Sequence, residues 1–385
     1  MEFEVKNAFE HIDKLAYEIG PRVSGTRGER LAVEYIVRKF RECGLQVDVQ
    51  WFEFTGRVST LSASGLILSA SFIFALLLQP LIGLLIWIAS LVTVFSLKSV
   101  LPAAESANII AFKKVPEPKK RVIISAHYDT APCIRNRKLL LFRKFTFVPL
   151  LALISALLIL RLLSPLDIPW IVWVVLAPVV LFSLLVPLIG ISGRGAPGAN
   201  DNASGVAVML ECARALSGEE NLDREVGFVA FGAEEQGLVG SKSIQRRHIQ
   251  NGDVVLNLDT LGTGDRFAVV EGNGVFRQVK TDQKINVLLE EIVRRNGQSP
   301  AYIWAAFSNH DHIPLLKNGV RSTTLTRVPQ KGDRLGRFIG KIIGRPNSIG
   351  WVHPYIHTET DLPDKISADA LELAGKIVLE CVKTI

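Results

Sequence analysis

Two long apolar blocks interrupt a chain in which apolar and polar positions otherwise alternate. The first, from about 61 to 97, has no charged residue and is divided by Gln79-Pro80. The second, from about 145 to 191, is divided at 161–169, where its only charges lie. As helices, the halves of the first block would each measure about 26 Å, just enough to cross an apolar core of about 30 Å. The pattern predicts four transmembrane helices in two hairpins; the alternative, buried core helices, rarely uses uncharged blocks this long.

The distribution of Lys and Arg around these blocks predicts their orientation. Two hairpins return the chain to the side that it left, so that all hydrophilic segments share one side. Cytoplasmic flanks of membrane helices carry the excess of Lys and Arg. The opposite side offers only Arg161, whereas the hydrophilic side carries eight cations: Arg57, Lys98, Arg135, Arg137, Lys138, Arg143, Lys144 and Arg194. We expect an integral protein of the plasma membrane whose hydrophilic domain faces the cytoplasm.

The remaining sequence predicts one discontinuous domain from 1–56, 102–130 and 195–385, with the hairpins at 57–101 and 131–194. Its candidate strands alternate with candidate helices, which predicts the α/β class with a mostly parallel central sheet covered by helices on both faces. The strands are expected at Val47–Phe54, Ala107–Phe112, Val122–Ser125, Val226–Phe231, Val254–Leu258 and Thr323–Thr326. The helices are expected at 6–19, 28–44, Ser204–Leu216, Lys284–Arg295 and Ala368–Val382.

Composition narrows the possible functions. Hydrophobic residues make up 48% of the 385 residues, which agrees with membrane segments, and the formal net charge is +7. The positive charge does not indicate nucleic acid, because the chain has no Arg-rich arm and no basic strand with spaced aromatic residues. The four cysteines are scattered without a short repeat, so neither a disulfide framework nor a cysteine metal site is expected.

Five short stretches rich in His, Asp and Glu follow candidate strands or lie in adjoining loops. They are AHYDT (126–130), GANDNASG (198–205), GAEEQG (232–237), NLDTLG (257–262) and HPYIHTETD (353–361). Sites in open α/β sheets form at the carboxyl ends of strands, so these stretches should converge there. Taken singly, each has an ordinary interpretation: a capping pair, a turn Asp or a solvated Glu pair. Their order, each beside a strand, favours a shared site.

A hydrolytic two-metal centre explains this combination of side chains. It needs a bridging carboxylate, terminal His and carboxylate ligands, and a base that is free of metal. His127 and Asp129 point the same way along an extended segment, so His127 can ligate while Asp129 holds its other ring nitrogen. The pair Glu234-Glu235 allows one carboxylate to ligate while the other remains free.

These stretches, with IGPRVSGTRGERLAVEYI (19–36), resemble the co-catalytic zinc exopeptidases, the family of bacterial leucyl aminopeptidases, glutamate carboxypeptidase and glutaminyl cyclase. The resemblance covers nearly all of the hydrophilic chain. It implies two zinc ions bridged by Asp201, the general base Glu234, and Asp129 as the residue that orients His127. The other implied ligands are His127, Glu235, Asp259 and His357. It also implies a cis peptide bond at Asp201-Asn202.

The chain departs from the family pattern at one motif besides the hairpins. The family often has Ser-Asp-His before its last ligand, whereas this chain reads FSNHDHIPLL (307–316), which leaves the roles of His310, Asp311 and His312 open. His353 competes with His357 as the last ligand, but only His357 is followed by Thr and, four residues later, by Asp.

The basic segment 331–345 predicts either a solvated loop or an element lying against anionic lipid headgroups.

These features predict a membrane-anchored metallo-exopeptidase, most simply an aminopeptidase, that hydrolyses terminal peptide bonds with a metal-bridging water. Its partners would be a peptide substrate and the lipid bilayer. One alternative is a glutaminyl-cyclase-like acyltransferase, although those enzymes use one zinc and lack parts of the second metal set. Another is an inactive membrane scaffold, although this chain keeps every ligand and the base. The sequence leaves the choice between amino- and carboxypeptidase, the side-chain preference and the oligomeric state open.

Overall fold

The computed structural model describes residues 2–101, 103–116, 120–163, 170–219, 222–275, 277–306, 308–329, 334–345, 347–349 and 353–385. The chain divides into two compact units. The first comprises Met1–Phe52, Glu105–Pro132 and Arg194–Ile385, and the second comprises Glu53–Ala104 and Cys133–Gly193.

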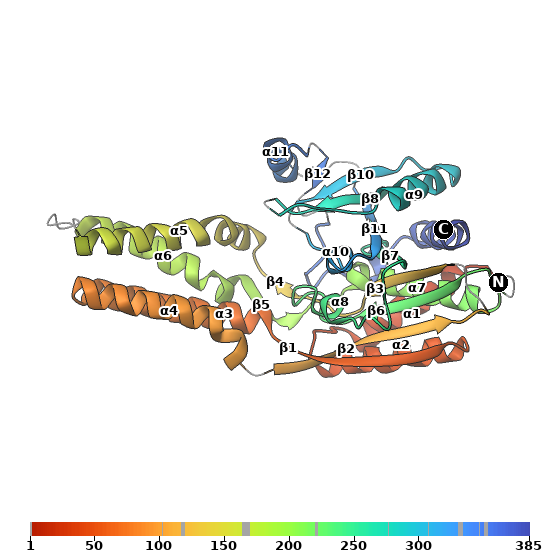
Figure 1. Ribbon diagram of the computed structural model, residues 1–385, viewed down its shortest axis with the longest axis horizontal. Helices are drawn as coiled ribbons and strands as arrows, with labels where there is room; N and C mark the ends of the chain where they lie inside the picture. Colours follow the sequence, from red (N-terminus) through yellow and green to blue (C-terminus); the bar gives the residue numbers. More distant parts are fainter. Residues whose placement is uncertain are drawn as a thin grey trace. The chain divides into compact units, whose positions relative to one another are not determined.

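The first unit is built on a ten-stranded sheet in the order β1-β2-β6-β3-β7-β11-β8-β10-β12, with β9 paired to β8 (Figure 1). The strands β6, β3, β7 and β11 run parallel to one another. The strands β8, β10 and β12 are also parallel to one another. Two pairs are antiparallel: β2 with β6, and β8 with β11. The bounds are β1 Gln46–Thr55, β2 Ala103–Lys113, β3 Arg121–His127, β6 Glu225–Phe231, β7 Val254–Leu258, β8 Arg266–Asn273, β9 Val279–Lys280, β10 Ala301–Ala305, β11 Arg321–Val328 and β12 Ser348–Ile349.

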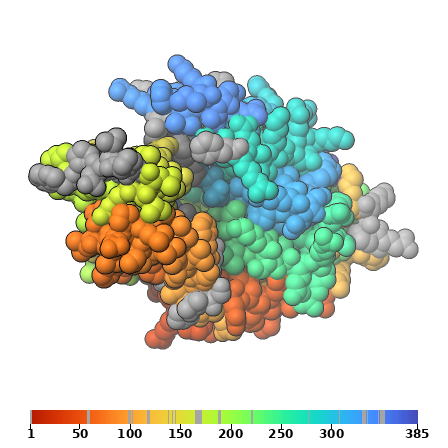
Figure 2. All heavy atoms as spheres, turned by 60° about the vertical axis from the view of Figure 1, so that its left-hand side comes forward, coloured from red at the N-terminus to blue at the C-terminus, as the bar shows by residue number. Residues whose placement is uncertain are grey.

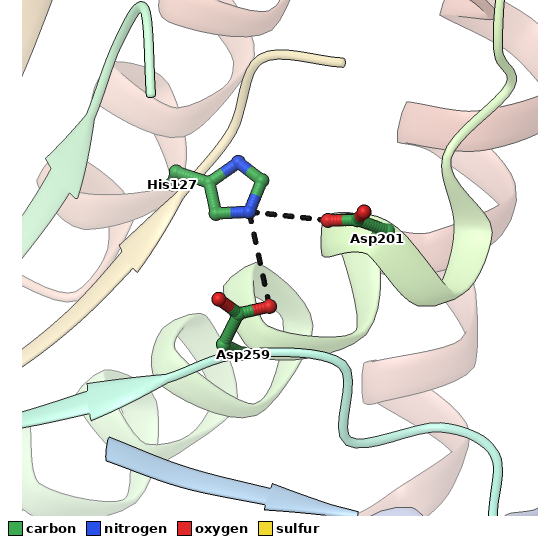
Figure 3. Close-up of side chains that lie close together, drawn as sticks. All are labelled: His127, Asp201 and Asp259. Atoms are coloured by element: carbon green, nitrogen blue, oxygen red, sulfur yellow. Dashed lines mark ion pairs between the residues drawn. The ribbon is translucent and has the colours of Figure 1, made fainter. Parts of the chain in front are cut away.

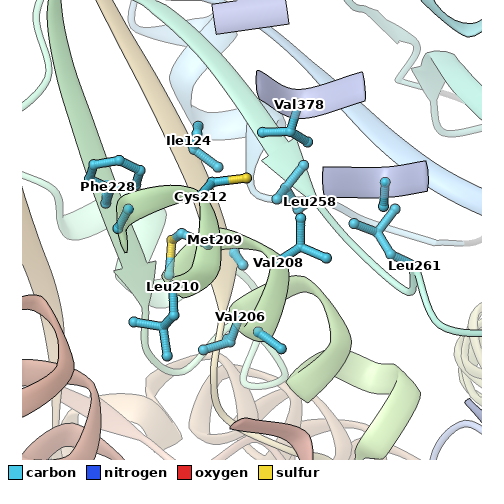
Figure 4. Packing of buried hydrophobic residues seen from close by; sticks show 14 of the residues in the cluster. Ile124, Val206, Val208, Met209, Leu210, Cys212, Phe228, Leu258, Leu261 and Val378 are labelled. Atoms are coloured by element: carbon cyan, nitrogen blue, oxygen red, sulfur yellow. The ribbon is translucent and has the colours of Figure 1, made fainter. Parts of the chain in front are cut away.

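Alternate residues of the central strands enter two different cores, which is the period expected of a sheet covered on both faces. In β3, Val122 and Ile124 belong to the larger core and Ile123 to the smaller one. The larger core contains α7, whose buried Val206, Val208 and Met209 are shown in Figure 4. The predicted α/β class with a mostly parallel sheet is therefore confirmed.

The helices of this unit match the predicted positions closely where the apolar period was strong. Near the predicted helix at 6–19, α1 Val5–Ile12 continues into a π-helical segment at Asp13–Ile19. The others are α2 Arg27–Glu42, α7 Ser204–Ser217, α8 Val239–Ser243, α9 Gln283–Arg295, α10 His312–Lys317, α11 Arg334–Ile342 and α12 Ala368–Thr384. The short strands β4 Pro132–Ile134 and β5 Ile191–Gly195 pair with each other at the second insertion.

The second unit consists of four apolar helices, α3 Arg57–Leu77, α4 Pro80–Val100, α5 Arg137–Leu163 and α6 Trp170–Gly190. Three contain segments long and apolar enough to cross a membrane, at Thr60–Leu77, Pro80–Leu97 and Lys138–Leu163, and α6 contains a shorter one at Ile171–Val186. The expected divider at 161–169 lies largely outside the described residues. The helix α5 begins at Arg137, eight residues before the apolar block, because basic residues are good helix formers and do not end a helix.

The four helices pack through a buried apolar cluster that includes Trp87 and Leu184, through a close approach at one glycine and through internal polar contacts. A Cβ on Gly65 would lie 2.2 Å from the carbonyl oxygen of Leu184, so α3 and α6 can approach this closely only because position 65 is glycine. The Trp87 indole N–H donates to the Ser155 hydroxyl at 2.9 Å. Many of the large apolar side chains, by contrast, point away from the bundle, as Phe95 does with 86% exposure. Apolar side chains thus occupy both the interior and the outer surface of the bundle.

Candidate metal centre

The three adjacent parallel strands β6, β3 and β7 end at the same edge of the sheet and bring three of the motifs together. His127 is the last residue of β3, Asp259 follows the last residue of β7, and Glu234-Glu235 lie three and four residues beyond β6. The backbone adopts left-handed φ values at Ala233 (52°), Thr260 (54°) and His357 (58°). Such values are rare for residues other than glycine, and here they occur within or directly beside the motifs.

Asp201 approaches from a tight loop before α7. The peptide bond Asp201-Asn202 is cis, as the resemblance implied. The Asn202 side chain fastens this loop to the end of β7, since it donates to the Leu258 carbonyl at 2.9 Å and accepts from the Thr260 N–H at 3.2 Å. The buried carboxylate of Asp361 accepts from the N–H of Asn200 at 2.8 Å and of Asp201 at 3.1 Å. Asp201 is therefore held by groups on both sides of the loop.

The two carboxylate oxygens of Asp201 face different histidines. Its Oδ1 lies 3.2 Å from Nε2 of His127, and its Oδ2 lies 3.1 Å from Nε2 of His357. The same His127 nitrogen lies 3.9 Å from Asp259, as the dashed lines in Figure 3 mark. The His357 nitrogen lies 2.9 Å from Oε1 of Glu235. Two potential ligand groups result, one of His127, Asp201 and Asp259 and one of Asp201, Glu235 and His357, with ligand atoms within 4.8 Å of one another in each.

Buried negative charge dominates this cluster. Burial raises the pKa of Asp259 to about 7, and the neighbouring Asp201 contributes to the rise. Burial lowers the pKa of His127 and of His357, but the surrounding carboxylates outweigh it and raise both pKa values well above the ordinary range. Within the described residues, the ion pairs of Asp201, Glu235 and Asp259 all involve histidines. A carboxylate and imidazole set of this kind, lacking Lys or Arg partners, suits a divalent metal.

Asp129 acts mainly on the Glu234-Glu235 loop. Its carboxylate accepts from the N–H of Glu234 at 3.0 Å, from the N–H of Glu235 at 3.2 Å and from the Ser24 hydroxyl at 2.9 Å. The ring of His127 meets the Asp129 backbone carbonyl at 3.2 Å, whereas the carboxylate is 3.6 Å away. Asp129 therefore contacts His127 chiefly through its main chain, whereas its carboxylate, which was expected to orient His127, fixes the neighbouring loop.

Glu234 differs from its neighbour in its contacts. Its carboxylate forms no hydrogen bond with any residue that the structure describes, whereas Glu235 contacts His357. Burial and the nearby Glu235 raise the pKa of Glu234 well above the ordinary range of a carboxyl group, against the opposing effect of His127. A carboxyl group of raised pKa beside a ligand group is suited to accept and return a proton.

His310 and His312 belong to a buried hydrogen-bond network beside the cluster. The Thr324 hydroxyl contacts Nδ1 of His312 at 2.6 Å, and Nε2 of His312 contacts Oδ1 of Asn273 at 2.7 Å. The Asn273 amide in turn meets Nδ1 of His310 at 2.8 Å, and Nε2 of His310 lies 3.8 Å from Oδ2 of Asp259. Asp311 lies between the two histidines in sequence, and burial raises the pKa of its carboxyl group to about 6.

His353 lies outside the cluster. Its Nδ1 contacts the Thr263 hydroxyl at 3.0 Å, and its Nε2 contacts the Arg327 carbonyl at 2.7 Å. Both ring nitrogens are thus engaged by groups other than the carboxylates, while the nitrogen of His357 points at two of them.

Sequence reasoning missed Arg22, which joins the π-helical segment Asp13–Ile19 and its end to the loops that follow β3 and precede α7. Its guanidinium is fully buried and donates to the carbonyls of Leu15, Gly20, Tyr128, Pro197 and Gly198 at 2.8–3.1 Å. Burial lowers its pKa to about 10, although Asp361 and other carboxylates oppose the shift. The tripeptide Gly20-Pro21-Arg22 lies in the stretch 19–36 that carries the family resemblance. This position in the sequence was the one indication that Arg22 has a structural role.

A family model described as Peptidase family M28 matches residues 179–382, which is more than half of the chain. Aminopeptidase YwaD of Bacillus subtilis is 33% identical over 198 residues, a match that covers 48% of this chain and 37% of that protein. The chain thus spans little more than a third of that relative's length.

Two solved structures illustrate the likeness of fold. A zinc aminopeptidase from Bacillus subtilis has a TM-score of 0.57 at 20% identity, covering 99% of this chain and 94% of its own. A glutaminyl cyclase from Bacteroides thetaiotaomicron has a TM-score of 0.60 at 17% identity, covering 100% and 99%. Since the sheet, the order of the motifs and the family model agree, the protein belongs to Peptidase family M28, the co-catalytic zinc exopeptidases.

Proposed function

We propose that this protein is a membrane-anchored aminopeptidase whose catalytic centre holds two zinc ions. The position of Asp201 carries the proposal: its two carboxylate oxygens face His127 at 3.2 Å and His357 at 3.1 Å, so that one side chain belongs to both ligand groups. One ion would be held by His127, Asp201 and Asp259, and the other by Asp201, Glu235 and His357. Shared carboxylates of this kind are typical of two-metal hydrolases.

The side chains divide the chemistry between them. When bound, the ions supply Lewis acidity toward the scissile carbonyl and toward water. Glu234 takes the proton from the attacking water and later delivers it to the leaving amine, since its carboxylate is not engaged by other described residues. Asp129 keeps Glu234 in place through the hydrogen bond from its N–H. His127, whose ring contacts the Asp129 carbonyl through Nδ1, presents Nε2 to the ligand group.

The choice of an aminopeptidase rests on the names of the relatives, which include Aminopeptidase YwaD and several leucine aminopeptidases. A cyclase-like acyltransferase on the same fold is less compatible with the ligand set, because both His127 and Asp259 are present to hold an ion in addition to the one at Asp201, Glu235 and His357. The substrate would be a peptide with a free amino terminus.

We further propose that α3, α4, α5 and α6 cross the plasma membrane as the hairpins 57–101 and 131–194. The hydrolase domain of 1–56, 102–130 and 195–385 would then lie in the cytoplasm. The apolar, outward-facing side chains of α3 to α6 support the membrane anchor, and the charge asymmetry around the hairpins supports the orientation.

The decisive experiment measures metal content and activity in the same samples of the full-length chain in nanodiscs. After chelation and titration with zinc, we expect two ions per chain, hydrolysis of aminoacyl p-nitroanilides and no hydrolysis of their N-acetylated forms. Asp201→Asn should weaken binding of both ions, whereas Asp369→Asn, at an exposed carboxylate of α12, serves as the control. One ion at saturation, with cyclisation of amino-terminal glutamine instead of hydrolysis, would support the acyltransferase and contradict the proposal.

A further inference from the structure

The helix α11, Arg334–Ile342, exposes a face on which basic and large apolar side chains alternate. The exposed residues follow helical spacing, at Arg334, Arg337, Phe338, Lys341 and Ile342. Phe338 is 62% exposed and Ile342 is 66% exposed, one turn apart. Figure 2 shows this part of the chain in mid-blue at the surface, at the top of the view.

The opposite face of α11 explains how the helix is held. Gly336 and Gly340 are buried, and Ile339 and Ile343 are half-buried, so the helix packs through its glycine side. Beyond its end, Arg345 stacks over the Trp304 ring at 4.2 Å and donates to Gln278. A free peptide of nine residues would not be helical in water, but here the packing has already formed the helix. The outward Phe338 and Ile342 are thus presented on a preformed scaffold.

We propose that this face binds the surface of an anionic lipid bilayer. Arg334, Arg337 and Lys341 would contact phosphate groups, while Phe338 and Ile342 would enter the boundary between headgroups and acyl chains. A bilayer fits better than an acidic peptide, because the helix combines its cations with two protruding apolar groups that the headgroup–acyl boundary can take up. The inference rests on the proposed membrane anchor, which would keep α11 close to lipid at high effective concentration.

The test places an environment-sensitive fluorophore on Phe338→Cys in the full-length chain, with Cys43→Ser to reduce background labelling. Nanodiscs contain phosphatidylcholine alone or mixed with phosphatidylglycerol. We expect a blue-shifted, severalfold brighter emission in the anionic discs, with quenching by nitroxide attached to the lipids. The matched control is Val287→Cys, another exposed apolar position on a helix, which should show neither effect.

Charge reversal at Arg334, Arg337 and Lys341 together should return the fluorophore at 338 to water, while zinc-dependent hydrolysis is retained. A label at 338 that reports water in both lipid mixtures overturns the inference. So does a label that poly-glutamate shields while lipid does not, because it identifies an acidic peptide as the partner. Extraction with alkaline carbonate separates the two proposals: a chain that stays in the membrane with its label in water refutes only the role of α11, whereas a released chain refutes the anchor.

Discussion

The side-chain amide of Asn273 donates a hydrogen bond to Nδ1 of His310 at 2.8 Å. The same amide nitrogen donates to the Ser308 carbonyl at 2.9 Å, and a carbonyl can only accept, so the amide can be oriented in only one way. Its oxygen therefore accepts from Nε2 of His312 at 2.7 Å. A neutral His310 that accepts at Nδ1 must carry its proton on Nε2, and this atom faces Asp259 at 3.8 Å. Asn273 therefore determines which tautomer of His310 faces Asp259, one of the proposed metal ligands.

Replacing this amide by an acceptor should weaken metal binding. In Asn273→Asp, the new carboxylate pulls the proton of His310 to Nδ1 or makes the ring cationic. Either change disturbs Asp259. Its carboxylate would face the lone pair of Nε2 in the first case, and the positive charge of the His310 ring, which competes with the metal, in the second. Zinc affinity, measured by chelator competition, should fall about 10-fold or more, as is usual for partners of metal ligands. Asn286→Asp is the control, since this buried amide contacts Thr281 and Thr323 instead; an equal loss there would contradict the explanation.

The adjacent residues Glu234 and Glu235 should respond oppositely to the same substitution. Glu234→Gln should retain both ions and lose turnover by about 10²–10⁴-fold, since only proton transfer is removed. Glu235→Gln should lose metal, because its carboxylate lies 2.9 Å from Nε2 of His357 in the second ligand group. Metal analysis and steady-state kinetics on the same preparations decide the assignment. The reverse outcome would exchange the two roles.

The free energy of unfolding should depend on pH through His11, which lies far from the proposed metal ligands in the sequence. Its Nδ1 contacts the Tyr35 hydroxyl at 2.6 Å, and burial, with a contribution from Lys39, lowers the pKa of His11 to about 4. Between about pH 6.5 and pH 4 the unfolded chain binds a proton that the folded chain does not, so the free energy of unfolding falls as pH falls. The loss should reach about 2 kcal/mol at about pH 5.

Urea titrations of the metal-free, detergent-solubilised protein at about pH 7 and about pH 5 measure this effect. His11→Gln keeps a partner for Tyr35 but cannot take up a proton, so its unfolding free energy should fall less between the two values. Equal losses in the two proteins would show that other groups cause the pH dependence.

The proposed orientation can be tested with single cysteines. Gln79, between α3 and α4, should react with an impermeant maleimide in intact cells when replaced by Cys, because it would lie outside. Tyr17, 77% exposed in the hydrolase unit, should react as Cys only after the cells are opened. The converse pattern would place the hydrolase outside the cell. Reaction at neither position in intact cells would indicate helices that do not cross the bilayer.

The sequence was most informative where burial imposes a continuous apolar run. Val254–Leu258, buried throughout, was predicted with its observed bounds. The strands β8 and β10 were not predicted, because Arg266–Asn273 mixes charged, apolar and glycine residues and Ala301–Ala305 is short. For the segment 331–345 the sequence predicts either a solvated loop or a surface-lying element, and Gly336 and Gly340 lower the helix propensity of α11. The structure shows that these glycines face inward, which only tertiary packing decides.

The site was predictable to the extent that its residues follow strand ends. His127 and Asp259 stand at the ends of β3 and β7, where pattern and topology agree. Asn273 and Thr324 could not be predicted, since a polar residue within a strand becomes a partner of His312 only when β8 and β11 pair. The contact of Asp129 with the N–H groups after β6 likewise depends on the pairing of β3 with β6.

The second hairpin separates His127 from every other proposed ligand in the order of synthesis. His127 emerges from the ribosome before α5 and α6, whereas Asp201 and the residues that follow it emerge afterwards. Chains elongate at about 5–20 residues per second, so the ligands become available many seconds apart. If the hairpins enter the bilayer as they are made, the two ligand groups can close only on a chain that is already inserted. Newly made protein would then be unable to cleave cytoplasmic peptides before it reaches its membrane.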